Sequence, residues 1–131
     1  MTQVLRGNIV HAPAMGRLDI LEHGCLVLED GVITGLYPDL PAHLEGAEVR
    51  DFGDRIIMQS FADMHLHAPQ YPMLGMGMDL PLLDWLNTYT FPTEARFADL
   101  DYARRVYRRL ATDLITNGTT RVCMSVSYTH L

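Results

Sequence analysis

The sequence of 131 residues contains no lysine, because all ten of its basic residues are arginines. Within these residues, the absence of lysine excludes Schiff-base catalysis, a phosphate-binding P-loop and a metal bridge built on a carbamylated lysine. Sixteen acidic residues leave a net charge of -6, and the sequence has no basic run. An acidic surface repels phosphate backbones and anionic lipids, so we expect neither nucleic acid nor a membrane as a partner.

Cysteine and long apolar stretches are also scarce. Cys25 and Cys123 lie far apart and match neither a CxxC pair nor a secreted disulfide framework, which predicts buried, reduced thiols. No apolar stretch approaches the roughly 20 residues of a membrane span, and the first residues do not resemble a signal peptide. These features predict a cytoplasmic protein.

The first part of the sequence, residues 1–58, has the pattern of a small β-rich domain. Short apolar runs alternate with turns, and the pair Asp30-Gly31 between two such runs predicts a hairpin. About five strands are expected here, over residues 4–10, 25–28, 32–36, 47–52 and 55–58. We interpret this part as a sandwich-like unit.

Residues 59–124 have the pattern of an α/β domain. A strand is expected up to residue 67, followed by a loop of roughly 30 residues with a short helix over 81–86, then a helix over 99–117 and a strand over 119–124. Asp99 is the expected N-cap of the long helix and Gly118 its stop. This order is that of the first β/α unit and second strand of a parallel domain. Because a (β/α)₈ barrel needs about 250 residues, these residues either hold its first part or close their sheet differently.

The most specific local feature is the pair His65 and His67. Residues two apart in a strand point to the same face, so both imidazoles can reach one ion, with Asp63 one step earlier on that face. Imidazole suits zinc and ferrous iron. Such a pair also occurs by chance or on a solvated strand face. Its place at the end of a strand, before a long loop, favours a metal site, because catalytic residues follow the strands of a barrel.

Two stretches carry a resemblance to a known family. Residues 65–71 read HLHAPQY, and residues 79–97 read DLPLLDWLNTYTFPTEARF. The HxH pair alone indicates only the amidohydrolase superfamily, whereas the two longer stretches resemble its guanine deaminase family. The resemblance covers nearly the whole chain and is strongest over residues 61–123.

The resemblance implies a fold and a metal. The fold is the N-terminal part of a small β-sandwich, followed by the first βαβ portion of a truncated TIM-like barrel. One zinc ion per subunit, with ferrous iron as the alternative, would be held by His65 and His67. Two later histidines and an aspartate would complete the ligands, and a glutamate from a later barrel strand would act as general acid and base. None of these further groups has a counterpart in this sequence.

The resemblance also implies a substrate. The full-length protein would hydrolyse guanine to xanthine and ammonia in purine catabolism or salvage, with water as co-substrate, and would form a homodimer. The segment from His67 through Ala68 and Pro69 to Gln70 would form one wall of the guanine pocket. Trp85 is a further candidate contact, for which burial against the barrel is the alternative.

Two departures from the family pattern stand out. Gln59-Ser60 replaces the usual Pro-Gly before the first barrel strand, and residues 125–131 form an atypical tail that reads as non-native. For that reason His130 is not assigned as a ligand. Two other functions stay open: an amidohydrolase acting on a different aminated heterocycle, and a non-catalytic truncated fragment.

Overall fold

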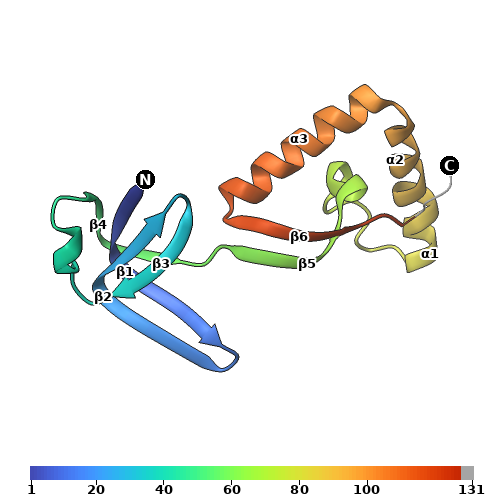
Figure 1. Ribbon diagram of the computed structural model, residues 1–131. Helices are drawn as coiled ribbons and strands as arrows, with labels where there is room; N and C mark the ends of the chain where they lie inside the picture. The colour runs from blue at the N-terminus through green and yellow to red at the C-terminus, as the bar shows by residue number, and fades with distance from the viewer. Residues whose placement is uncertain (128–131) are drawn as a thin grey trace. The chain divides into compact units, whose positions relative to one another are not determined.

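The computed structural model describes residues 1–127, which fall into two compact units that meet in sequence at Gln59 and Ser60 (Figure 1). The first unit is built on one four-stranded sheet in the order β3-β2-β1-β4. Its strands are β1 (Thr2–Ala14), β2 (Arg17–Glu29), β3 (Val32–Tyr37) and β4 (Glu48–Met58), with a 3₁₀ turn at η1 (Ala42–Leu44). Strand β1 pairs antiparallel with β2 and parallel with β4, so the chain crosses from one edge of the sheet to the other before β4.

The turn between β2 and β3 confirms the predicted hairpin. Asp30 and Gly31 have φ angles of 49° and 83°, the left-handed conformation that both central residues of a type I′ turn require. This turn fixes the register in which Glu29 lies opposite Val32.

The expectation of five strands is wrong by one, because the fourth and fifth are a single strand, β4. The break that the sequence indicates is a bulge at Gly53, which has a φ of 59° and donates its backbone N–H to Asp51 Oδ1 at 2.7 Å. The pairing with β1 shifts here, because Arg6 pairs with Asp51 and Asn8 with Ile56, so β4 contains three additional residues at this point without ending as a strand. The described residues of this unit form one sheet, so they do not by themselves make the two layers of a sandwich.

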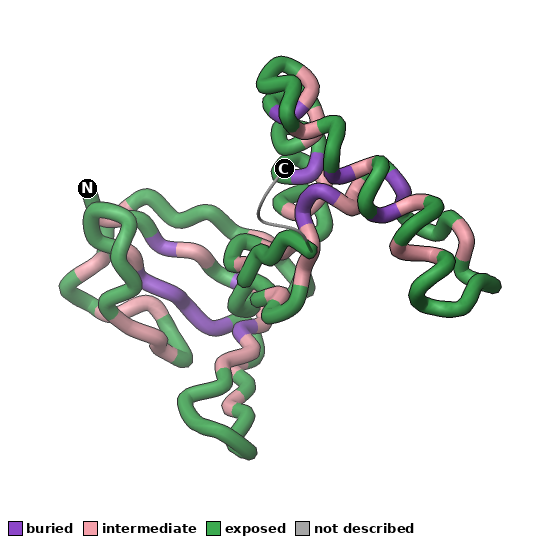
Figure 2. The backbone as a smooth tube through the Cα atoms, turned by 90° about the vertical axis from the view of Figure 1, so that its right-hand side faces the viewer, coloured by how far each residue is buried: buried purple, intermediate pink, exposed green. Residues whose placement is uncertain are grey.

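The core of the first unit is small. Val4, Cys25 and Val27 are buried and pack against half-buried side chains from the end of β3 and the segment after it (Figure 2). Burial raises the pKa of the Cys25 thiol, which agrees with an unreactive structural cysteine. The prediction of two buried thiols is wrong for Cys123, which is free and exposed on β6.

The second unit contains two parallel strands, β5 (Phe61–His67) and β6 (Thr119–Ser125). Between them the chain forms η2 (Ala68–Met73), α1 (Leu82–Trp85), the π-helical turn η3 (Leu86–Thr90), α2 (Phe91–Ala95), η4 (Arg96–Ala98) and α3 (Leu100–Thr116). The mixed α/β class and the predicted order of strand, helix and strand are confirmed. Closure into a barrel stays a prediction.

The predicted long loop is largely helical. The short helix expected to end at residue 86 continues as π-helical and α-helical turns to Ala95. Pro92 lies in the first turn of α2, directly after the π-helical turn. Helix α3 agrees with the prediction, because Asp99 accepts from two backbone N–H groups at its start and Gly118, with a φ of 81°, follows its end.

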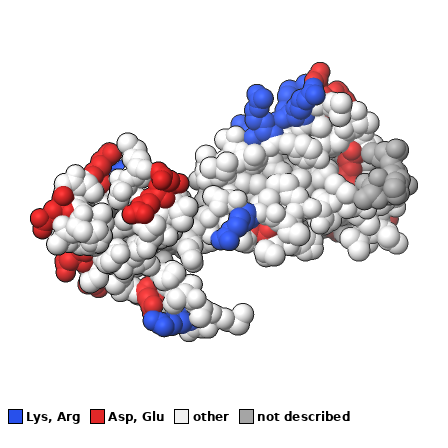
Figure 3. All heavy atoms as spheres, viewed as in Figure 1, with Lys and Arg blue, Asp and Glu red and all other residues white. Residues whose placement is uncertain are grey.

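One side of α3 faces the protein and the other faces solvent. Ala103 and Leu110 are buried, whereas exposed arginines cover the opposite side and form a positive patch (Figure 3). No helix in the described part of the chain is long and apolar enough to cross a membrane.

Candidate metal and substrate site

The imidazoles of His65 and His67 lie together on one face of β5. Their Nε2 atoms are 3.2 Å apart and their ring centroids 5.3 Å apart. The alternation of the strand places both side chains on this face, and pairing of His67 with Ser125 of β6 holds the end of the strand. His65 is exposed and His67 is half-buried, so the pair is accessible at the strand end.

The spacing of the two nitrogens fits a zinc ion. Zinc–nitrogen bonds of about 2.0–2.1 Å in a tetrahedral site separate two ligand atoms by about 3.3 Å, close to the observed distance. No group of three or more histidine, cysteine or carboxylate side chains that could hold a metal occurs in residues 1–127. Asp63 is not grouped with the two imidazoles, and its Oδ1 accepts the backbone N–H of His65 at 3.0 Å. The described residues therefore offer His65 and His67 as two candidate ligands, without a third beside them.

Ser127 lies next to the outer nitrogen of His67. Its Oγ is 3.2 Å from His67 Nδ1. A histidine that binds a metal through Nε2 carries its proton on Nδ1 and donates it to an oxygen, which fixes the orientation of the ring. Ser127 Oγ provides such an acceptor. Sequence reasoning missed this residue because it lies in the tail set aside as atypical; the rest of that tail, with His130, lies outside the described residues.

Gln70 follows the histidine pair on the 3₁₀ turn η2, which begins directly after His67. Ala68 and Pro69 are buried and anchor this turn, while the Gln70 side chain is half-buried. Gln70 Nε2 donates to Ser127 Oγ at 2.7 Å and to Glu94 Oε1 at 3.3 Å. Both amide hydrogens of Gln70 are thereby committed to protein oxygens.

Glu94 is the second residue that sequence reasoning missed. Its side chain comes from α2 and is only 4% exposed. Oε1 accepts from Gln70 and from the backbone N–H of Ser127, at 3.3 Å in each case. The sequence feature that could have identified Glu94 is a single acidic residue after Pro92 in a stretch with few charged residues.

A cavity of about 610 Å³ opens between β5, η2 and α3. Both histidines, Gln70 and Tyr71 line one side of it, and Leu110 and Leu114 are among the residues on the helix side. Its size falls in the range of about 300–1,000 Å³ that is typical of small-molecule sites. The cavity combines an apolar wall with a few polar groups, as small-molecule sites do.

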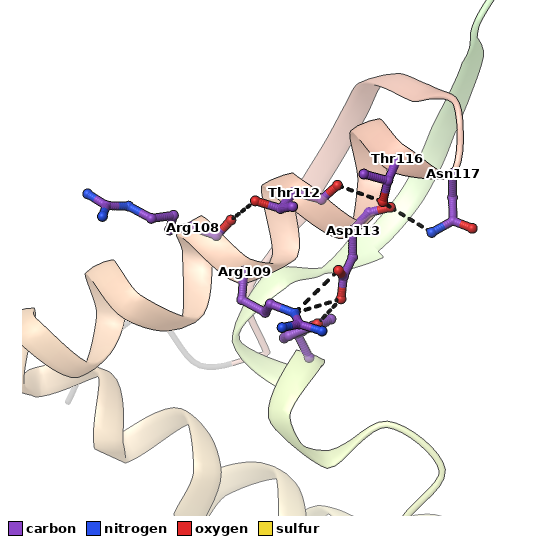
Figure 4. A network of polar contacts seen from close by, with 7 residues as sticks. Arg108, Arg109, Thr112, Asp113, Thr116 and Asn117 are labelled. Carbon is purple, nitrogen blue, oxygen red and sulfur yellow. Dashed lines mark hydrogen bonds and ion pairs between the residues drawn. The ribbon is translucent and has the colours of Figure 1, made fainter.

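A polar network ties η2 to α3 beside this cavity. The Tyr71 hydroxyl donates to Asp113 Oδ2. Arg109 Nε approaches the same carboxylate at 3.3 Å (Figure 4). The Tyr71 hydrogen bond, with help from Arg109, lowers the pKa of Asp113, and the same bond raises the pKa of Tyr71. Asn117 Nδ2 donates to the Asp113 carbonyl at 2.8 Å, closing the end of the helix.

Trp85 lies apart from the histidines and Gln70. It lines a different hollow, together with Gly77, Met78, Leu80 and Leu82. Its Nε1–H donates to the carbonyl of Met76 at 2.9 Å, so the polar atom of the Trp85 side chain has a partner in the segment before α1. A substrate contact from Trp85 stays a prediction, as do those from Ala68 and Pro69.

Comparison with known proteins gives a consistent result. No family model matches the sequence. The chain is 36% identical to guanine deaminase of Dictyostelium discoideum and 37% identical to that of Rattus norvegicus, in each case over 92% of its length. It also superposes on the crystal structure of guanine deaminase from C. acetobutylicum with bound guanine in the active site, with a TM-score of 0.89 and 42% identity over 95% of this chain. The chain is homologous to guanine deaminases.

This homology confirms the resemblance predicted from the two sequence stretches. The chain spans less than a third of the length of each guanine deaminase it matches: 31%, 28% and 30%. More than two thirds of those guanine deaminases therefore has no counterpart in the 131 residues. The described part offers the imidazoles of His65 and His67 and the carboxamide of Gln70 to the candidate site.

Proposed function

We propose that the full-length protein containing these residues is a zinc-dependent guanine deaminase. It would hydrolyse guanine at C2, where water adds and ammonia leaves, to give xanthine. The observation that carries this proposal is the pair of Nε2 atoms, 3.2 Å apart, beside Gln70 on one cavity, in a chain homologous to guanine deaminases.

His65 and His67 would hold the metal through Nε2. When bound, zinc acts as a Lewis acid and lowers the pKa of a water molecule. Ser127 Oγ would accept a hydrogen bond from the Nδ1–H group of His67 and keep the ring oriented, while Gln70 would bind one edge of the base. The general acid and base is a glutamate outside these residues, because Glu94 is buried with Oε1 already bonded to Gln70.

The test is an assay of the full-length protein with guanine, cytosine and a chlorotriazine as separate substrates. We expect xanthine and ammonia in equal amounts from guanine, and metal analysis showing one zinc per subunit. Loading the metal-free protein with zinc or ferrous iron identifies the active ion. Turnover of another heterocycle without xanthine formation would show that the protein is a different amidohydrolase. Light scattering tests whether the full-length protein is a homodimer.

A further inference from the structure

A buried carboxylate, Glu94, lies directly behind the Gln70 side chain. Burying a charged group is costly unless hydrogen bonds or an opposite charge compensate it. Glu94 Oε1 has two hydrogen-bond donors, but Oε2 is buried without a partner in the described part of the chain, and no ion pair to this residue is formed there. An apolar side chain of similar size would fill this position without that cost. The presence of a carboxylate at this buried position therefore indicates a role.

The chemistry of the two side chains determines which way the Gln70 amide points. A carboxylate oxygen accepts hydrogen bonds, so the NH₂ end of Gln70 must face Glu94. The second N–H of that group is taken by Ser127 Oγ at 2.7 Å. Gln70 Oε1 is then the polar atom of this side chain left for a ligand, and it can only accept.

A second buried oxygen without a partner lies in the helical segment that carries Glu94. Thr90, four residues earlier and on the same side of the helical run, is completely buried, and its Oγ1 also has no partner among residues 1–127. Thr90 ends the π-helical turn η3, and such turns are frequent at functional sites. Two buried oxygens without partners on one side of a helix are unusual for a purely structural segment.

We propose that Glu94 is a positioning residue that orients the Gln70 amide, so that the site accepts a substrate edge carrying an N–H donor and disfavours one presenting a lone pair. This inference rests on the proposed function, because it assigns Gln70 to the substrate. A ring nitrogen without hydrogen would meet the Gln70 oxygen lone pair to lone pair. Guanine carries several N–H donors on its edges and can satisfy this requirement.

The first experiment is a double-mutant cycle in the full-length protein. We expect Glu94→Leu and Gln70→Ala each to raise KM for guanine about tenfold, as the loss of one buried hydrogen bond does, with kcat changing less than about twofold. If Glu94 acts through Gln70, the double variant is no worse than Gln70→Ala. A double variant with the product of both effects, about a hundredfold, would overturn the proposal.

Two further variants separate positioning from folding. Glu94→Gln keeps a carbonyl oxygen that can accept from Gln70, so we expect it to recover most of the KM loss of Glu94→Leu. Failure of this rescue contradicts the proposed orientation. Glu45→Ala is the matched control, because Glu45 is an exposed glutamate in the first unit and its loss should leave KM unchanged. Zinc content should be equal in all variants.

The second experiment tests selectivity with guanines methylated at single ring nitrogens. In the unmodified protein, methylation of the recognised N–H should raise KM at least about tenfold, and this penalty should disappear in Gln70→Ala and shrink in Glu94→Leu. Penalties that are identical in all three proteins would overturn the selectivity assigned to Glu94.

The proposal can fail separately from the proposed function. The same double-mutant cycle, measured as melting temperatures without substrate, reports the contact between Glu94 and Gln70 directly. A protein that shows this coupling but forms no xanthine contradicts the proposed function alone. The positioning role alone is contradicted if the protein is active but the two substitutions have additive effects. In that case the decreases in melting temperature add, and the increases in KM multiply.

Discussion

The Tyr71 hydroxyl donates a hydrogen bond to the Asp113 carboxylate, and this contact joins the turn that carries Gln70 to helix α3. The two residues are far apart in sequence, so the bond closes the cavity wall rather than stabilising a local turn. It also holds the carboxylate of Asp113 in its charged form, with a lowered pKa.

Replacing Tyr71 with phenylalanine should therefore make stability less dependent on acid pH. A group with a lowered folded-state pKa stabilises the fold above its unfolded pKa of about 3.9 and stops doing so as the pH falls through the folded value. We expect the melting temperature of metal-free Tyr71→Phe to lie below that of the unmodified protein at pH 7, and the gap to close toward pH 2. A gap that is constant with pH would show that the Tyr71 contact does not act through Asp113 ionisation.

The N-terminus of α3 provides a second test. Asp99 Oδ1 accepts from the backbone N–H groups of Asp101 at 2.9 Å and Tyr102 at 3.1 Å. Asp99→Ala removes both bonds and should lower the melting temperature. Asp99→Asn keeps an accepting oxygen, so its melting temperature should fall much less. Equal losses in the two variants would mean that the negative charge, not the hydrogen bonds, stabilises the helix.

The metal assignment predicts loss of zinc on substitution of either histidine. His67→Ala should reduce bound zinc below about one tenth of an equivalent and abolish guanine turnover, because one imidazole alone does not anchor the ion on β5. His43→Ala is the control, since His43 is exposed on η1 in the first unit. Full zinc content in His67→Ala, measured by atomic emission, would remove His67 from the ligand set.

The 131 residues expressed by themselves should bind zinc no better than micromolar and should not form xanthine. Two imidazoles leave an ion mostly solvated, while a catalytic zinc typically has three protein ligands. Large apolar side chains such as Leu100 and Ile115 are also exposed on α3, which favours association. Calorimetry with zinc tests the affinity; a stoichiometric sub-micromolar site would show that the chain completes its ligand set by another route.

The elements that could be predicted from the sequence are those with a strong local signal. Asp99, Gly118 and the Asp30-Gly31 pair each act through a backbone conformation or a cap that one or two residues determine. The strand that carries His65 and His67 was predictable because alternation alone brings the two rings to one face.

The parts that were missed depend on contacts between distant residues. Nothing in the local sequence shows that Ser127 meets His67, or that Glu94 lies behind Gln70, because these contacts require β6 and α2 to be in place. The π-helical turn was missed for a related reason: residues 86–90 contain poor helix formers, and packing of Thr90 overrides that preference.

The π-helical turn at Leu86–Thr90 also restricts how the length of this segment can vary. A π-turn holds one residue more than an α-turn, so deleting a single residue within it would produce a regular helix. Because the wider turn takes up the additional residue, the residues that follow it keep nearly the rotation that they would have after a regular helix one residue shorter. A single-residue deletion within Leu86–Thr90 should therefore leave Glu94 facing Gln70. A deletion between Thr90 and Glu94 has no wide turn to absorb it and would rotate Glu94 by about 100° around the helix axis, away from Gln70. Active natural or engineered versions should therefore vary in length within the π-helical turn and not between Thr90 and Glu94.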